Sequence, residues 1–257
     1  MEAQRLNALR GWEWIKHGYA LFMKAPLLWI VVLMICLLAA VMLSSVPVVG
    51  EPLLTLLMPV LMVGLMFGCH SLEHGGELEL AHLFSGFYRQ TSNLITLGGI
   101  SLVSQFAIFG LMMVAGGTAL VSMLMSGNPE TDPEVMMQAL AGAGFAMLIG
   151  VVLFSTLMMA MQYAPMLVYF NNATPAQAMK LSFSAFTRNI APMLVYITTY
   201  MFLAILASLP MLLGWLVLLP LTFTSLFASY CDIFPPEKET LPSAETQSNF
   251  KPDKDTF

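Results

Sequence analysis

The sequence predicts an all-α polytopic membrane protein, and two observations carry that prediction. Hydrophobic residues make up 58% of the 257-residue chain and charged residues only 10%, whereas a soluble domain carries about a quarter of its residues as charged side chains. Six separate runs are also apolar over about 20 residues each, the length that a helix needs to cross a bilayer core of about 30 Å. The composition excludes an ordinary soluble enzyme, a disordered protein and a nucleic-acid binder.

Each apolar run is predicted to be a helix, because backbone polar groups must be satisfied within the segment in hydrocarbon and no run alternates like a barrel strand. The chain divides into a cytoplasmic amphipathic helix at 1–25, a transmembrane domain at 26–233 and a disordered cytoplasmic tail at 234–257, where Pro, Glu, Ser, Thr and Lys dominate. The six predicted spans are 26–46, 53–69, 94–117, 142–163, 190–209 and 211–230.

The basic residues predict the orientation of these spans. All ten Lys and Arg residues lie before the first span, between the second and third, between the fourth and fifth, or after the sixth. These segments are all on the same side of the membrane. The charged residues in the loops on the opposite side are all acidic. Lys and Arg are retained on the cytoplasmic side of a membrane protein. Both termini are therefore predicted to lie in the cytoplasm.

Three cytoplasmic segments share the pattern aromatic-x-x-Phe-x-basic, at 19–24, 84–89 and 183–188. Each lies on an amphipathic stretch, and the third begins at a capping box of Thr174 and Gln177 with Pro175 between them. We therefore predict three hairpins of two spans, each preceded by a cytoplasmic amphipathic interfacial helix. The alternative is that any span entering from the cytoplasm has an aromatic belt and a basic residue at its mouth. The apolar stripes are Trp12, Ile15, Tyr19 and Phe22; Leu80, Phe84 and Phe87; and Met179, Phe183, Phe186 and Ile190.

A weaker similarity links the second span to the sixth. Pro59 followed by Gly64 in the second span resembles Pro220 followed by Ser225 in the sixth. This similarity supports a true repeat, which is favoured because the pattern FS(G/A)FxR occurs in two copies, more than an aromatic belt alone requires.

A metal site is the first candidate for chemistry. His70 and His74 are four residues apart and would share one face of a continued helix, while Met62, Met66 and Cys69 offer the soft sulfur ligands that Cu(I) prefers. Against this, Gly75 and Gly76 interrupt the helix, and methionine is also a common filler of apolar gaps. We expect packing at the sulfur residues and solvation at the histidines, so no metal or other cofactor is predicted.

The basic residues that end the three repeated segments are the second candidate. Lys24, Arg89 and Arg188 each stand beside the mouth of a span, where a basic group can meet an anionic lipid headgroup. The alternative is that these residues only set the orientation of the spans. Membrane lipids are thus the expected partners, and a homo-oligomer or a membrane-protein partner is left open.

Ionisable residues deep in the spans would be the usual mark of transport or catalysis, and the sequence has none there. Gln105 is the most prominent polar side chain in a span, although such a residue more often bonds a neighbouring helix. We therefore expect a non-enzymatic protein with a structural role, or one that contacts lipids or a partner, in the envelope. The alternative is a transporter or channel for a small uncharged or amphiphilic solute, with Cu(I) handling as a third interpretation.

Two stretches carry a resemblance to a known family. They are LFSGF at 83–87 and the pattern A-P-x-L, A-x-K-x-S-F and N-x-x-P that runs from Ala164 to Pro192. Here the chain resembles an uncharacterised family of proteobacterial six-span inner-membrane proteins. The resemblance covers nearly the whole span region and implies a location in the bacterial inner membrane. It implies no activity, cofactor or catalytic residue.

Overall fold

The computed structural model describes residues 3–117, 133–211 and 213–235, and every regular element in these ranges is a helix. Six helical segments within them are long and apolar enough to cross a membrane, which confirms the predicted all-α, six-span fold. Most of their ends lie within four residues of the predicted ones. The segments are Pro26–Ser44, Gly50–Glu73, Thr91–Gly116, Ala141–Asn171, Ile190–Ser208 and Trp215–Ile233.

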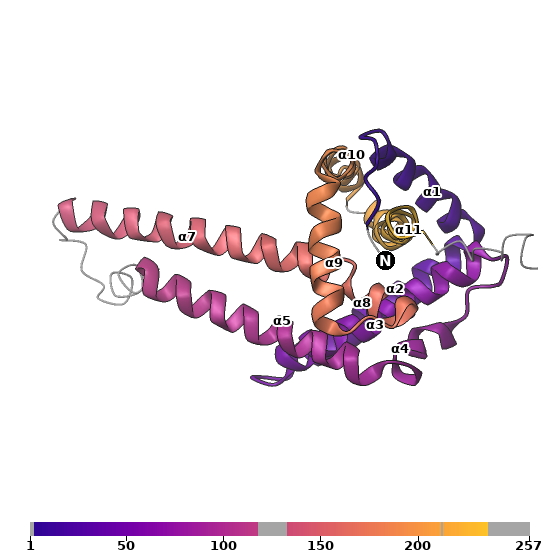
Figure 1. The fold of residues 1–257 in the computed structure, drawn as a ribbon, viewed down its shortest axis with the longest axis horizontal. Helices are drawn as coiled ribbons and strands as arrows, with labels where there is room; N and C mark the ends of the chain where they lie inside the picture. The colour runs from indigo at the N-terminus through magenta and orange to yellow at the C-terminus, as the bar shows by residue number, and fades with distance from the viewer. Residues whose placement is uncertain (1–2, 118–132, 212, 236–257) are drawn as a thin grey trace, which may run out of the picture.

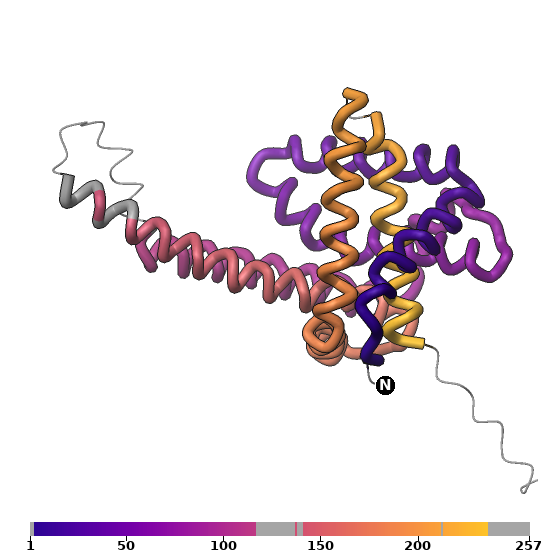
Figure 2. The backbone as a smooth tube through the Cα atoms, turned by 90° about the horizontal axis from the view of Figure 1, so that it is seen from above, coloured from indigo at the N-terminus to yellow at the C-terminus, as the bar shows by residue number. Residues whose placement is uncertain are grey.

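The first span packs against the second, the third against the fourth and the fifth against the sixth. Helix α2 (Pro26–Ser44) contacts α3 (Gly50–Glu73), α5 (Thr91–Met112) contacts α7 (Pro133–Met161), and α10 (Ile190–Ser208) contacts α11 (Trp215–Ile233). Figure 1 shows α5 and α7 running side by side out of the remaining helices as one arm. Figure 2 shows α10 and α11 side by side, with their axes running across the direction of that arm.

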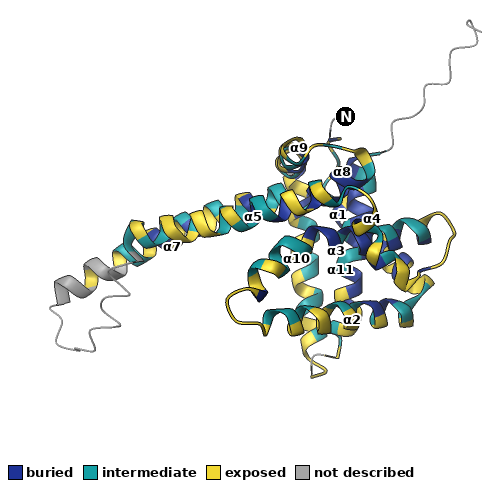
Figure 3. Cartoon of the chain, turned by 90° about the horizontal axis from the view of Figure 1, so that it is seen from below, coloured by how far each residue is buried: buried dark blue, intermediate teal, exposed yellow. Residues whose placement is uncertain are grey.

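Small residues hold the arm together. A Cβ on Gly116 would meet the carbonyl oxygen of Gly142 at 2.3 Å, and a Cβ on Gly150 would meet the sulfur of Met112 at 2.4 Å. The small residues of α7 therefore bring it close to its own partner α5, as small residues do where helices approach in a membrane. The outer surface of the arm is exposed along much of its length (Figure 3).

The fourth span contains a break that the sequence prediction placed at its end. Helix α7 stops at Met161 and α8 (Ala164–Asn171) continues with Pro165 in its first turn. The backbone N–H of Tyr163 donates to Ser182 Oγ at 3.0 Å, so it leaves the helical hydrogen-bonding pattern. A proline in the first turn suits the start of a new helix because it has no N–H to donate.

The three repeated segments form α1 (Arg10–Lys24), a pair of short helices η1 (Leu80–Phe84) and α4 (Ser85–Tyr88), and α9 (Pro175–Arg188). The start of α9 is confirmed, since Thr174 and Gln177 form the expected capping box. The second segment is two short pieces and not a single helix. In α1, the predicted stripe is divided: Ile15 and Phe22 are buried, whereas Trp12 and Tyr19 are about half exposed.

One packing contact recurs at each of these segments. Gly18 of α1 lies against Ser225 of α11, and Leu83 of η1 lies against Gly64 of α3. Ser182 of α9 donates to a carbonyl oxygen of α7 at 2.7 Å. Each segment therefore contacts a different span: α1 the sixth, η1 the second and α9 the fourth. We call α1, η1, α4 and α9 the base ring. The residues at the shared position, directly before the aromatic one, are Gly18, Leu83 and Ser182.

The centre of the molecule is built on α3 and α11, about half of whose apolar windows are buried (44% and 56%) against 11–17% for the other four spans. Tyrosine hydroxyls from other helices bond to one face of α11. Tyr163 pairs with Ser229 at 2.9 Å and Tyr196 with Ser225 at 2.8 Å, and Tyr200 pairs with Thr222. Such bonds fix helices where burial in lipid gives no hydrophobic driving force.

Candidate functional site

An apolar cavity of about 520 Å³, which we call the central chamber, lies among the spans. Side chains of α2, α3, α5, α7, α8 and α11 line it. Its volume lies within the usual range for sites that bind small molecules, about 300–1,000 Å³. Leu65 and Ser101 at its wall are almost fully buried, whereas Leu37 and Met58 are about half exposed. The chamber therefore reaches from the core to the lipid-facing surface.

Three polar side chains interrupt the apolar lining: Thr55, Ser101 and Gln105. The hydroxyl of Thr55 donates to the carbonyl oxygen of Glu51 on its own helix at 3.0 Å. Gln105 Nε2 donates to Ser101 Oγ at 3.2 Å, and the amide oxygen of Gln105 accepts no hydrogen bond from a described residue. The chamber thus offers one amide acceptor in an otherwise apolar space.

The sulfur and imidazole candidates from the sequence lie in different surroundings. Met62 lines the central chamber, while Met66 and Cys69 are fully buried. His70 stacks on His74 with ring centroids 4.2 Å apart and on Phe170 at 5.4 Å. Within the described residues, no group of three or more His, Cys, Asp or Glu side chains is placed to hold a metal ion. The structure therefore adds no support for metal binding here.

The three basic candidates each bond to a protein acceptor. Lys24 Nζ donates to the carbonyl oxygen of Leu72 at 2.6 Å, at the end of α3. Arg89 donates to Asn172 Oδ1 at 3.0 Å and lies 5.8 Å from the ring centroid of Tyr169. Arg188 Nη1 lies 3.4 Å from the carbonyl oxygen of Ala3. Each residue fastens the base ring to a neighbouring segment, and a role in binding lipid headgroups stays a prediction.

The sequence analysis missed an ion pair that joins the first and last helices of the described chain. Arg10 of α1 donates through Nε to Asp232 Oδ2 of α11 at 2.8 Å, and through Nη2 to Asp232 Oδ1. Trp14 Nε1 donates to the same carboxylate at 2.8 Å. The hydrogen bond to Asp232 raises the pKa of Arg10 above its ordinary value. A planar guanidinium that meets both carboxylate oxygens fixes distance and orientation together.

A second missed contact involves Asn189, which is fully buried where α9 meets α10. Its amide nitrogen donates to the carbonyl oxygen of Gln4 at 2.8 Å, and its amide oxygen accepts from the N–H of Leu6 at 2.8 Å. The N–H of Gln4 in turn donates to the carbonyl oxygen of Ile233 at 3.0 Å. The segment before α1 is therefore held between the ends of α9 and α11.

The chain is similar along most of its length to a probable inner membrane protein of Burkholderia thailandensis. The two are 30% identical over 251 residues, which is 91% of this chain and 92% of that protein. No family model matches the chain, and no solved structure matches it. With six apolar helices in the described ranges, the match shows that this chain belongs to the same family of multi-pass inner-membrane proteins as the Burkholderia protein.

Proposed function

We propose that the protein is a non-enzymatic component of the inner membrane that holds the acyl chain of a membrane lipid in the central chamber. Its base ring and both termini would face the cytoplasm. In this proposal the protein serves envelope organisation by fixing lipid between its spans.

The observation that carries the proposal is the chamber itself, about 520 Å³ of apolar space between six helices of a membrane protein. A water molecule needs two to four polar partners to occupy a cavity, and apolar cavities stay dry. Where the half-exposed Leu37 and Met58 mark the edge, the neighbouring medium is hydrocarbon. An acyl chain is therefore the occupant that the surroundings supply. The single amide of Gln105 does not provide the several polar partners that water would need.

The lining also argues against catalysis. General acid–base chemistry needs a titratable group within hydrogen-bonding reach of the substrate, and the described lining has no His, Asp, Glu, Lys or Arg. A route for a polar solute would need polar groups along its wall, so the transporter alternative is confined to a small uncharged or amphiphilic solute.

The proposed orientation rests on charge. All ten Lys and Arg residues lie on the side of both termini, and the hydrogen bonds of Arg10, Lys24, Arg89 and Arg188 join the base ring to the span ends or to the segment before α1. Basic residues near membrane ends remain in the cytoplasm.

A phospholipid that carries a photoactivatable diazirine in its acyl chain tests the proposal. The purified protein, reconstituted with this lipid and irradiated, should be labelled on peptides that contain Met62 or Gln105. Ala40→Trp places an indole at the chamber wall and should strongly reduce that labelling, because the ring competes for the same space. Ala39→Trp is the matched control, since Ala39 is exposed on the same helix and does not line the chamber. Equal labelling of the two variants would contradict the proposal.

A further inference from the structure

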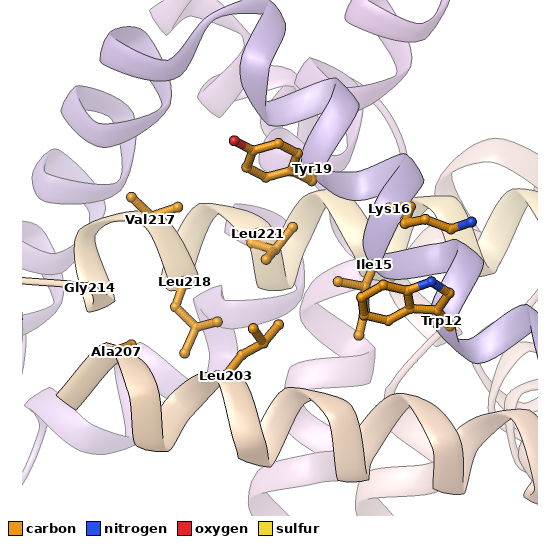
Figure 4. A pocket seen from close by; sticks show the side chains of 10 residues that line it. All are labelled: Trp12, Ile15, Lys16, Tyr19, Leu203, Ala207, Gly214, Val217, Leu218 and Leu221. Carbon is orange, nitrogen blue, oxygen red and sulfur yellow. The ribbon is translucent and has the colours of Figure 1, made fainter. Parts of the chain in front are cut away.

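A second apolar cavity, of about 450 Å³, lies between α1 and the pair α10 and α11. We call it the lateral groove, and Figure 4 shows its lining. Trp12, Ile15 and Tyr19 form the wall on α1, which is where the sequence predicted an apolar stripe. The opposite wall consists of Leu203 and Ala207 from α10, Val217, Leu218 and Leu221 from α11, and Gly214 between them.

The two ends of the groove differ in chemistry. At one end, Ala207 and Gly214 lie near the turn between α10 and α11, and at the other end lies Lys16 (Figure 4). Trp12 and Tyr19 are 46% and 50% exposed, so each ring has one apolar surface in the groove and another outside it. Trp and Tyr are enriched at the headgroup level of membranes because their rings are amphipathic.

Lys16 differs from the other two basic residues of α1. Arg10 is bonded to Asp232 and Glu13, and Lys24 to a carbonyl oxygen of α3. Lys16 is exposed and makes no hydrogen bond or ion pair with a described residue.

Glu13 and Asp232, the carboxylates that line a pocket with Lys16, are already engaged. Asp232 accepts bonds from Arg10 and Trp14, and Glu13 pairs with Arg10. The ammonium group therefore remains available to an anion from outside the protein.

We propose that the lateral groove binds one anionic phospholipid, with its phosphate at Lys16 and an acyl chain along Leu203, Val217 and Leu218. This inference uses the cytoplasmic position of α1 proposed above, because anionic lipids supply the negative potential of the cytoplasmic leaflet. It does not depend on the central chamber. An amphipathic helix that keeps its basic group at headgroup level while its apolar side meets acyl chains is the general form of interfacial binding.

Quenching of Trp12 fluorescence by phospholipids with brominated acyl chains reports occupancy directly. Trp14 and Trp29 are almost fully buried. The contribution of Trp12 to the quenched fluorescence is the difference between the unaltered protein and the Trp12→Phe variant. In vesicles of defined composition, brominated phosphatidylglycerol should quench Trp12 more strongly than brominated phosphatidylcholine at equal mole fraction.

Two pairs of variants separate charge from shape. Lys16→Gln should weaken the preference for phosphatidylglycerol roughly fivefold, the effect of about one basic residue at an anionic surface. Lys180→Gln is its control, since Lys180 is also exposed and lies on α9. Val217→Phe should reduce quenching by both lipids because the larger ring fills the groove without adding a second indole to the signal. Leu216→Phe should not, because Leu216 has the same 40% exposure but does not line the groove.

An unchanged preference in Lys16→Gln, or equal quenching in the Val217→Phe and Leu216→Phe variants, would overturn the inference. Ala40→Phe in the central chamber should leave the quenching of Trp12 as in the unaltered protein. Photolabelling tests lipid in the central chamber, and Trp12 quenching tests lipid in the lateral groove. Either experiment can give a negative result without the other, so this inference and the proposed function are tested separately.

Discussion

Gly18 of α1 lies directly against Ser225 of α11, and a Cβ at Gly18 would come within 2.5 Å of the backbone nitrogen of Ser225. These two residues are the point at which the first helix of the chain meets the last span. The absence of a side chain at Gly18 allows the two backbones to approach this closely, as is common where membrane helices cross.

Gly18→Ala should destabilise the protein by about 1–3 kcal/mol, the usual cost of forcing extra atoms into a packed core. The new methyl group would meet backbone atoms of α11, which cannot rotate away. Thermal unfolding of the detergent-solubilised protein measures the effect. Gly110→Ala is the matched control, because no heavy atom lies within 4 Å of a Cβ at that helical position. Equal melting temperatures for the two variants would contradict the packing argument.

Asp232→Asn should loosen α1 from α11, because the amide no longer offers two anionic oxygens to Arg10 and Trp14. Hydrogen bonds to charged groups are worth about 1.5–3 kcal/mol, and solvent at the half-exposed Arg10 reduces this to about 1 kcal/mol. Limited trypsin cleavage after Arg10 and Lys16 should accelerate about fivefold. Glu13→Gln, which removes an exposed partner of the same arginine, should change the rate much less.

Asn189→Ala should release the segment before α1. The substitution leaves the carbonyl oxygen of Gln4 and the N–H of Leu6 without their buried partner, at a cost of about 1–3 kcal/mol. Hydrogen exchange at the Leu6 amide should become faster. Asn7→Ala in the same segment is the control, because the side chain of Asn7 is exposed and makes no hydrogen bond with a described residue. Unchanged exchange in the Asn189 variant would show that the segment is held by other contacts.

Changing Met62, Met66 and Cys69 together to Leu, Leu and Ala should leave copper content and copper tolerance unchanged. Met66 and Cys69 are fully buried, and Met62 lines an apolar chamber, surroundings in which we expect all three side chains to serve packing. Metal analysis of the purified protein gives the answer. A clear loss of bound Cu(I) would establish the sulfur residues as ligands.

Reporter fusions test the proposed orientation. Fusions in the turns at 44–51 and 209–214 should report the periplasm, and fusions at His74, Ala173 and the C-terminus should report the cytoplasm. The same experiment addresses the turn at 127–134, most of which lies outside the described residues. A cytoplasmic signal from that turn would refute the scheme of three hairpins.

The spans and the start of α9 could be predicted from the sequence because their causes are local. A bilayer demands about 20 apolar residues in succession, and the capping box of Thr174 and Gln177 uses groups only three residues apart. The ion pair of Arg10 and Asp232 joins positions 222 residues apart. Nothing in either neighbourhood indicates the partner, and an aspartate at the end of a span looks like any solvated helix end.

The central chamber and the ring contacts escaped prediction for a different reason. In a span where almost every residue is apolar, hydropathy cannot tell Leu37 at the edge of the chamber from Leu38 on the outer surface. The ring contact uses Gly18, Leu83 and Ser182 at one shared position, and these residues have no common chemistry. What recurs is the place of the contact and not the type of side chain.

The meeting of α1 with α11 also governs how the protein is made. The ribosome completes α1 about 200 residues before it reaches Ser225, an interval on the order of tens of seconds at ordinary rates of synthesis. Throughout that time Trp14 and Gly18 have no α11 to cover them. A chain that terminates early would keep this surface uncovered permanently. Full-length and truncated products thus differ in how much of their first helix is covered.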